Sequence, residues 1–317
     1  MNKKILILGG TGFIGKNLVK YYLKKNYWIT ATYNKSIPFI KHKNIKWLKT
    51  NLCNSHQVKS IFIDNYDLVI QCAATTSGSK DIINNPSLHV TDNAIMNSLI
   101  LKYFNQSLSK HIIFFSCTVM LRSNKKPQRE IDYKIQIDPI NKYFGVGWTK
   151  IYIEKIMKFY SNLNLKQKYT VIRHSNIYGP YDKFDLEKGH VLASAIVKVY
   201  QSKDKVIMWG DGSEKRDLLY IDDLCNLVNK LYKKQKENYL LINCGLGRSV
   251  SILDLYKKII EISKKNLLIE KDLSKPTIKF DLTLNSEFAK KRYGWSPIND
   301  IDKGITKTLN WYKKNYE

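Results

Sequence analysis

The sequence predicts an α/β fold, a Rossmann-type doubly wound parallel sheet, from two observations. Short β-branched runs alternate with longer helical patterns. A glycine-rich loop joins the first such run to the first helical pattern. With 317 residues and 44% hydrophobic content, the chain can bury a large core. Beyond about residue 176 the alternation weakens, which predicts a smaller α/β lobe that binds the substrate.

The predicted elements follow one another in a regular order. Strands are expected at 4–10, 28–34, 67–74, 111–117 and 169–176, where β-branched and aromatic residues are dense. Helices are expected between them, at 15–26, 55–65, 93–110 and 148–160, where apolar residues recur at helical spacing. Strands connected through helices pair in parallel with right-handed crossovers.

The chain shows no internal repeat and no low-complexity linker. We therefore expect two interwoven domains. The dinucleotide-binding domain is predicted to comprise residues 1–175 with about 215–245, and the substrate lobe residues 176–214 with 246–317.

The net charge of +26 admits nucleic acid, an anionic membrane or an anionic small substrate as partners. The lysines are spread among many Asn, Ile and Tyr residues, without a block of five or more basic residues. This distribution favours a solvated basic surface. No nucleic-acid-binding motif accompanies the charge, so we expect no nucleic acid partner, and a phosphorylated substrate is the main alternative use of the charge.

The five cysteines are scattered and lack a C-x-x-C spacing, and the six histidines form no ligand-spaced pair. These features indicate a reducing compartment and no metal site. No apolar run approaches the ~20 residues of a membrane span, and no signal-peptide pattern opens the chain. We expect a cytoplasmic protein with no membrane partner.

The glycine-rich loop "ILILGGTGFIG" predicts a dinucleotide site. Its glycines give the turn conformational freedom and let the backbone approach a pyrophosphate, while the following helix N-terminus offers N–H groups. The residues expected to bind the cofactor here are Gly9, Thr11, Gly12, Phe13, Ile14 and Gly15.

Later strand ends supply the other expected cofactor contacts. After the second strand, where NAD-binding folds carry an acid, this chain has Asn34 and Lys35, so NAD and NADP both stay open. Asn51 and Leu52 are expected beside the adenine, and the small residues Ala73, Ala74 and Thr75 where a strand end passes the cofactor.

Taken together, the motifs resemble those of the extended short-chain dehydrogenase/reductases, the NAD-dependent epimerase/dehydratase family. The resemblance covers nearly the whole chain and is nearest to the GDP-fucose synthase-like branch. It rests on "GGTGFIG", "VIQCAA", "FFSCTVM", "WTKIYIEK", "IRHSNIYGP", "WGDGSEKRDLLYIDDL", "INCGLGRSVSILDL" and "RYGWSPINDIDKGITKTLNWY".

The resemblance implies roles for individual residues. Ser116 matches the serine that hydrogen-bonds the reacting sugar oxygen, and Lys150 matches the lysine that holds the nicotinamide ribose and lowers the tyrosine pKa. Positions near the sugar, the nucleotide and its phosphates are matched by Asn176, His190, Trp209 and Arg216. His190 matches a histidine that acts as an acid in epimerisation, and a positioning role for it stays equally open.

Two residues depart from the family pattern. Val146 stands where the Tyr-x-x-x-Lys pair has its tyrosine, so the ordinary proton relay is interrupted. Thr118 stands where fucose synthases carry a cysteine base, which makes double epimerisation doubtful. The neighbouring Cys117 is expected on the opposite face of the strand. Tyr143, one turn before Val146, is the first candidate to replace the tyrosine, and Thr118, His190 or a water molecule are the others. That Tyr143 only packs at the helix start stays open as the alternative.

The resemblance implies an NAD(P)-dependent enzyme acting on a nucleotide-diphosphate sugar. We expect a GDP-linked hexose, deoxyhexose or heptose, with hydride transfer at C4 as a 4-dehydrogenase or 4-keto reductase, in the synthesis of surface polysaccharide sugars. A homodimer is common in the family. The alternatives are a nucleotide-sugar 4-epimerase and a non-catalytic dinucleotide sensor or scaffold, the latter favoured by Val146.

Overall fold

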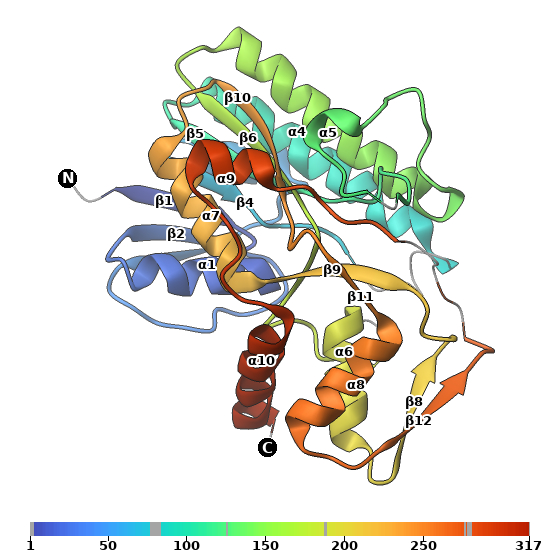
Figure 1. Cartoon of the computed structure of the whole chain (residues 1–317). Helices are drawn as coiled ribbons and strands as arrows, with labels where there is room; N and C mark the ends of the chain where they lie inside the picture. Colours follow the sequence, from blue (N-terminus) through green and yellow to red (C-terminus); the bar gives the residue numbers. More distant parts are fainter. Residues whose placement is uncertain are drawn as a thin grey trace.

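The computed structural model of the chain describes residues 3–76, 84–124, 126–186, 189–275, 277 and 281–316 (Figure 1). Its central layer is a seven-stranded sheet in which every neighbouring pair is parallel. The strands, in sheet order, are β10 (Tyr239–Cys244), β6 (Lys168–His174), β5 (His111–Ser116), β4 (Leu68–Gln71), β1 (Lys4–Leu8), β2 (Trp28–Tyr33) and β3 (Ile45–Lys49). This order confirms the predicted Rossmann-type sheet.

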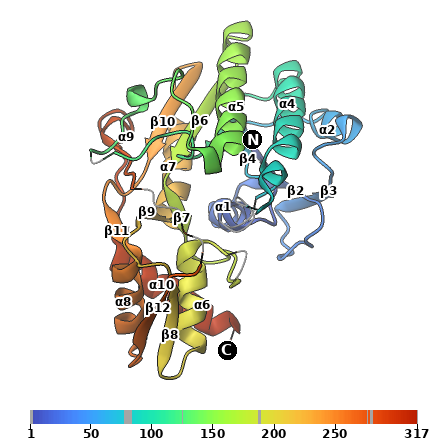
Figure 2. The same ribbon diagram turned by 90° about the vertical axis from the view of Figure 1, so that its right-hand side faces the viewer.

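Helices cover both faces of the sheet (Figures 1 and 2). Alternate residues of β1 belong to two separate cores: Ile5 and Ile7 to one, Leu6 and Leu8 to the other. The first core includes residues of α1 (Phe13–Leu23), α7 (Ile221–Lys234) and α9 (Glu287–Tyr293). The second includes residues of α2 (Ser55–Ile61), α4 (Thr91–Gln106) and α5 (Phe144–Leu163). Such a doubly covered sheet explains why its strands are continuously apolar.

A second lobe occupies the lower part of both views. It contains the parallel pair β8 (Lys205–Trp209) and β12 (Leu268–Asp272), together with α6 (Val191–Gln201), α8 (Ile252–Ser263) and α10 (Ile301–Tyr316). A three-stranded sheet of β11 (Ser249–Ser251), β9 (Lys215–Tyr220) and β7 (Asn176–Tyr178) leads into it. Short 3-10 turns lie at Pro86–His89, Glu130–Asp132 and Asn141–Tyr143. No helix of the described chain is long and apolar enough to cross a membrane.

Two details differ from the sequence expectations. The edge strand β3 was not predicted, because its half-exposed residues alternate only weakly. Residues from about 215 were predicted to belong to the dinucleotide-binding domain. Strand β9, which begins at residue 215, pairs with β7 and β11 rather than with the central sheet. The division into two domains otherwise stays a prediction.

Asp217, on β9, ties three chain segments together. Its carboxylate accepts hydrogen bonds from the backbone N–H groups of Leu246 (2.8 Å), Gly247 (3.2 Å) and Leu284 (3.1 Å). Burial raises the pKa of Asp217 to about 6, although the three N–H donors favour the charged form. The folded chain therefore takes up a proton here as the pH falls through about 6, and this uptake stabilises it relative to the unfolded chain.

We expect Asp217→Ala to lower the free energy of unfolding by about 3 kcal/mol or more, because a buried N–H without an acceptor costs about 1–3 kcal/mol. Chemical denaturation measures the loss. Asp204→Ala is the matched control, since Asp204 is an exposed acid just before β8, and a change below about 0.5 kcal/mol is expected there. Equal losses in the two variants would show that Asp217 does not hold these segments.

Candidate active site

The glycine-rich loop lies at the carboxyl end of β1, beside β4, where the order of the strands reverses. Gly9 has φ +77°, and a Cβ there would stand 2.7 Å from the Ala73 Cα. A Cβ on Gly15 would stand 2.2 Å from the Gly9 carbonyl oxygen. A Cβ on Gly12 would stand 3.4 Å from its nearest neighbour, the Gly9 carbonyl oxygen. Packing therefore requires Gly9 and Gly15, whereas the space at Gly12 is left for a ligand.

The first turn of α1 fits a pyrophosphate. Gly12 is its N-cap residue, and no side chain of the described residues caps this turn. Backbone N–H groups at an uncapped helix start bind anions well. Thr32 at the end of β2 holds the loop, accepting hydrogen bonds from the N–H of Gly9 (2.9 Å) and of Gly10 (2.8 Å). The loop thus has the geometry that a dinucleotide requires.

A pair of alanine variants separates folding from cofactor binding at this loop. Gly12→Ala should keep the melting temperature, because its Cβ would lie 3.4 Å from the Gly9 oxygen, an ordinary contact, at φ −77°. It should weaken NADH and NADPH binding by roughly tenfold or more, since the methyl group would occupy the predicted phosphate position. Gly15→Ala should lower the melting temperature, because its Cβ overlaps the Gly9 oxygen. Nicotinamide fluorescence and thermal unfolding report the two effects. Unchanged binding in Gly12→Ala would place the pyrophosphate elsewhere.

The other residues predicted to bind the cofactor occupy varied environments. Asn34 and Lys35 are exposed immediately after β2, where both could reach an adenosine ribose. Asn51 is exposed, and its side-chain oxygen accepts from the Cys53 N–H at 3.0 Å. Leu52 is only 7% exposed and packs in the core beneath the sheet. Leu52 therefore has little surface left for an adenine.

The segment after β4 is held by residues that the sequence analysis did not single out. Asn93 of α4 pairs with both backbone groups of Thr75, at 3.1 Å to its N–H and 2.9 Å to its carbonyl oxygen. Gln71 similarly accepts from the Ala73 N–H (3.1 Å) and donates to Asn97 (3.0 Å). In the sequence, the signal for this contact was the pair Asn93 and Asn97, two amides four residues apart on one predicted helix. They position Ala73, Ala74 and Thr75 at the sheet edge beside Gly9.

Helix α5 carries the residues matched to the catalytic pair. It begins at Phe144, so Val146 lies in its first turn and Tyr143 is its N-cap residue. Tyr143 also ends the 3-10 turn Asn141–Tyr143, and α5 starts earlier than the predicted residue 148. Lys150 reaches the end of β5, where its Nζ donates to the Phe115 carbonyl oxygen at 3.0 Å and lies 4.7 Å from the centre of the Phe114 ring.

Four ionisable side chains influence one another at the start of α5. Burial raises the pKa of Tyr143, an effect that the Arg216 guanidinium opposes and the Cys117 thiol reinforces. Burial lowers the pKa of Lys150, against the influence of Cys117 and Glu154. The thiol of Cys117 has a raised pKa through burial, which Lys150 partly offsets. These influences link Arg216 to Tyr143, Tyr143 to Cys117 and Cys117 to Lys150, and we refer to the four residues as one cluster.

Ser116 is placed differently from the expectation. It is fully buried, and its hydroxyl donates to Glu154 Oε1 at 2.6 Å. Glu154, one turn after Lys150, forms an ion pair with Arg173 at 2.6 Å, with both side chains almost entirely buried. The Ser116 side chain thus faces the interior beneath α5 rather than open space. Its direct contact with a sugar stays a prediction that would require this network to open.

At the end of β5, the hydrogen bond to Glu154 gives the direction of the Ser116 side chain. The thiol of Cys117, the residue after the strand, is influenced by Lys150, Glu154 and Arg173, so its predicted place on the opposite face stays a prediction. Thr118 follows in a partly exposed turn closed by the Leu121 N–H at 2.9 Å from its carbonyl oxygen.

Residues matched to the nucleotide and sugar lie on the second lobe and its small sheet. Asn176 opens β7 and donates to the Asp217 carbonyl oxygen at 3.1 Å. Trp209 is the last residue of β8, and the Lys198 ammonium lies 4.5 Å from the centre of its ring. Arg216 lies on β9, and burial lowers the pKa of its guanidinium, against the influence of Tyr143, Glu214 and Asp281. His190 is the N-cap residue of α6, with its ring centre 6.5 Å from that of Phe13 in the glycine-rich loop.

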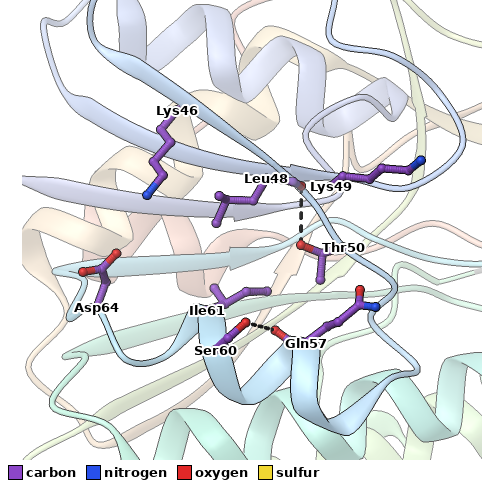
Figure 3. Close-up of a pocket in the computed structure, with 8 residues that line it drawn as sticks. All are labelled: Lys46, Leu48, Lys49, Thr50, Gln57, Ser60, Ile61 and Asp64. Atoms are coloured by element: carbon purple, nitrogen blue, oxygen red, sulfur yellow. Dashed lines mark hydrogen bonds between the residues drawn. The ribbon is translucent and has the colours of Figure 1, made fainter.

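A separate hollow lies between β3 and α2, at the outer edge of the sheet (Figure 3). Its lining alternates cationic, polar and apolar side chains: Lys46, Leu48, Lys49, Thr50, Gln57, Ser60, Ile61 and Asp64. Figure 3 shows that the Thr50 hydroxyl donates to the Leu48 carbonyl oxygen and the Ser60 hydroxyl to that of Gln57. None of the residues predicted to act in binding or catalysis lines it.

A dinucleotide loop at the switch point of a parallel sheet, with a partly buried lysine reaching the end of β5 and a tyrosine just before the same helix, defines a Rossmann-type dinucleotide-dependent enzyme. The chain belongs to the NAD dependent epimerase/dehydratase family, whose sequence profile matches residues 5–245. It is accordingly an NAD(P)-dependent enzyme of the extended short-chain dehydrogenase/reductase type, in a family that acts on nucleotide sugars.

Individual relatives resemble the chain over nearly its full length. GDP-L-colitose synthase of Yersinia pseudotuberculosis is 26% identical, over 98% of this chain and 97% of its own. GDP-L-fucose synthase of Azorhizobium caulinodans is 23% identical, over 98% and 96%. Among solved structures, UDP-glucose 4-epimerase of Thermotoga maritima with UDP-glucose superposes with a TM-score of 0.87 at 23% identity, over 99% of this chain and 100% of that one. The last comparison establishes the shared fold.

Proposed function

We propose that the chain is an oxidoreductase that transfers hydride at C4 of a GDP-linked hexose, deoxyhexose or heptose, as a 4-dehydrogenase or 4-keto reductase. The cluster of Tyr143, Lys150, Cys117 and Arg216 carries this proposal. It keeps the lysine of the family's catalytic pair and brings a phenol to the same helix start despite Val146. A surface-polysaccharide pathway is the proposed context.

Bound NAD(P) would supply or take the hydride. The chain's own residues then handle the proton at the sugar oxygen. Tyr143 exchanges it, because its hydroxyl lies where α5 begins and the Arg216 cation opposes the burial that raises the tyrosine pKa. Lys150, held at the Phe115 carbonyl oxygen, orients the ribose and stabilises negative charge. The Thr118 hydroxyl stays protonated near neutral pH, so it cannot remove a proton from the carbon beside the carbonyl. This favours redox chemistry over epimerisation at that carbon.

The GDP moiety is supported by relatives whose names specify GDP-sugars. The test mixes purified protein with NAD+ or NADP+, then with NADH or NADPH, and with GDP-, UDP- and dTDP-linked sugars. A change in reduced-nicotinamide absorbance with a GDP-sugar alone is the expected result. A response to UDP-sugars alone would reject the GDP assignment. Interconversion of C4 epimers without net absorbance change would indicate a 4-epimerase, and dinucleotide binding without any reaction would indicate a sensor or scaffold.

We also propose a homodimer through α4 and α5, which pack side by side (Figure 2). Both helices expose large apolar side chains: Ile95 (41%), Tyr152 (43%), Phe159 (55%) and Leu163 (61%). Exposed apolar groups on adjacent helices are typical of self-association surfaces. Light scattering after size exclusion reports the mass, and a monomer at micromolar concentration would contradict this assembly.

A further inference from the structure

His190 and Asp182 form a close pair at the start of α6. His190 Nδ1 lies 2.7 Å from Asp182 Oδ1. The Asp182 side chain is fully buried, whereas that of His190 is 49% exposed. Because a carboxylate only accepts, Nδ1 must carry a hydrogen, and Nε2 then lies on the exposed side of the ring.

The acid itself is incompletely neutralised. Asp182 Oδ1 also accepts from the Lys183 N–H at 2.7 Å, but its buried Oδ2 has no hydrogen-bond partner among the described residues. An uncompensated buried carboxylate strongly favours a positive neighbour. The neighbour available to it is His190.

The segment that carries Asp182 is clamped to α1, the helix that follows the glycine-rich loop. Asn17 Nδ2 donates to the Pro180 carbonyl oxygen at 2.8 Å, and Lys20 Nζ donates to the Tyr181 hydroxyl at 2.9 Å. Tyr181 has φ +68°, a left-handed conformation that costs a non-glycine residue about 1 kcal/mol or more. Contacts to Trp311 (ring centres 4.8 Å apart) and to α1 hold it there. Helix α1 thereby sets the place of Asp182 relative to the dinucleotide loop.

The charged groups around His190 come from several elements. On its own loop are Asp182 and Lys183, and at the end of β6 is His174, whose pKa burial lowers to about 4 and whose charged form Lys150 and His190 further disfavour. From α1, Lys20 is bound to Tyr181. Burial opposes the charged form of His190, but Asp182 outweighs burial and Lys183, so the pKa of His190 is raised above its usual value.

We propose that Asp182 is a positioning residue that holds His190 with Nδ1–H toward the carboxylate and a charged Nε2–H toward the space beside Phe13, where it donates to an oxygen of the nucleotide-diphosphate sugar. This inference rests on the proposed function for its substrate. Phe13 begins α1, so the donor lies next to the predicted pyrophosphate turn. The sequence motif indicated His190 alone; the pair appears only in the folded chain.

The first test is independent of turnover. In full-length protein labelled with 15N-histidine, NMR titration gives the tautomer and pKa of His190, assigned by its loss in His190→Gln. Asp182→Asn should lower that pKa by about one unit or more, because the opposing charge is gone, and should weaken the Nδ1–H signature. Asp204→Asn, an exposed acid beyond the far end of α6, is the charge-matched control and should change nothing. An unchanged His190 in Asp182→Asn would overturn the proposal.

The second test asks whether the donor faces the ligand. Adding NAD+ with GDP, or with UDP, to the wild-type protein should shift the His190 Nε2 resonance, and the shift should be lost in Asp182→Asn. No shift with either nucleotide would overturn the proposal. With a sugar nucleotide that reacts, kcat/KM is measured as a function of pH. The fall of kcat/KM at alkaline pH should move to lower pH in Asp182→Asn and return toward the wild-type position in Asp182→Glu. If no sugar nucleotide reacts but the NMR results are as expected, the proposed reaction is rejected and the pairing of Asp182 with His190 stands.

Discussion

Tyr143→Phe should lower kcat by about 10²- to 10⁴-fold, the range that a positioned acid or base contributes. The phenol is the hydroxyl that the fold brings to the cluster around Lys150, and Val146 has no proton to exchange. Phenylalanine keeps the ring packing, so the melting temperature and dinucleotide affinity should stay unchanged. Stopped-flow measurement of reduced nicotinamide with the reacting sugar separates the chemical step from product release.

Matched variants make this result specific. Tyr152→Phe removes a hydroxyl from the exposed side of the same helix, where it bonds to Ser98 at 3.0 Å, and should leave the rate unchanged. Adding Val146→Tyr to the Tyr143→Phe variant should recover part of the lost rate by restoring the family's spacing to Lys150. An unchanged rate in Tyr143→Phe, with a large loss in Cys117→Ala, would instead assign the proton to the thiol.

Arg173→Leu should lower the free energy of unfolding by about 3–5 kcal/mol, the range for breaking a buried ion pair from one side. Arg173 donates from Nε and Nη2 to the two Glu154 oxygens, at 3.0 and 2.6 Å. Removing it leaves the Glu154 charge buried, with the Ser116 hydroxyl as its remaining side-chain donor among the described residues. Urea unfolding followed by circular dichroism measures the loss.

The double variant Arg173→Leu with Glu154→Leu is the control for that prediction. Because both charges are removed together, it should be clearly more stable than Arg173→Leu alone. A double variant as unstable as the sum of the two single variants would mean that packing, rather than charge, dominates at this position. Arg173 also donates to the Glu130 carbonyl oxygen at 3.4 Å, so part of the loss can come from that loop.

Much of the fold could be predicted from local patterns. The alternation of apolar runs indicated five of the seven central strands and the helices between them, because buried strands and amphipathic helices have periods visible over a few residues. Strand β3 escaped because an edge strand is half exposed. Helix α5 begins at Phe144, before the predicted start at 148, although the glycines at 145 and 147 have a low helix propensity.

The candidate site was predictable only in part. Motif spacing placed Lys150 and the glycine-rich loop at the same edge of the sheet, and the structure has them at the carboxyl ends of β5 and β1, with β4 between them. The sequence could not tell that the Ser116 hydroxyl donates to Glu154, because that contact depends on how α5 packs on the end of β5. Asn93, which clasps Thr75, was missed because its partner lies 18 residues away in the chain.

The sequence by itself determined the Rossmann-type class of sheet, the dinucleotide loop, the place of Lys150 in its motif and the valine at position 146, because each depends on residues close together in the chain. Only the tertiary structure decided which side chains meet: Tyr143 with Arg216, Arg173 with Glu154, and Asp182 with His190. These pairs depend on how strands and helices from distant segments pack, and their energies arise from burial, which no local pattern records.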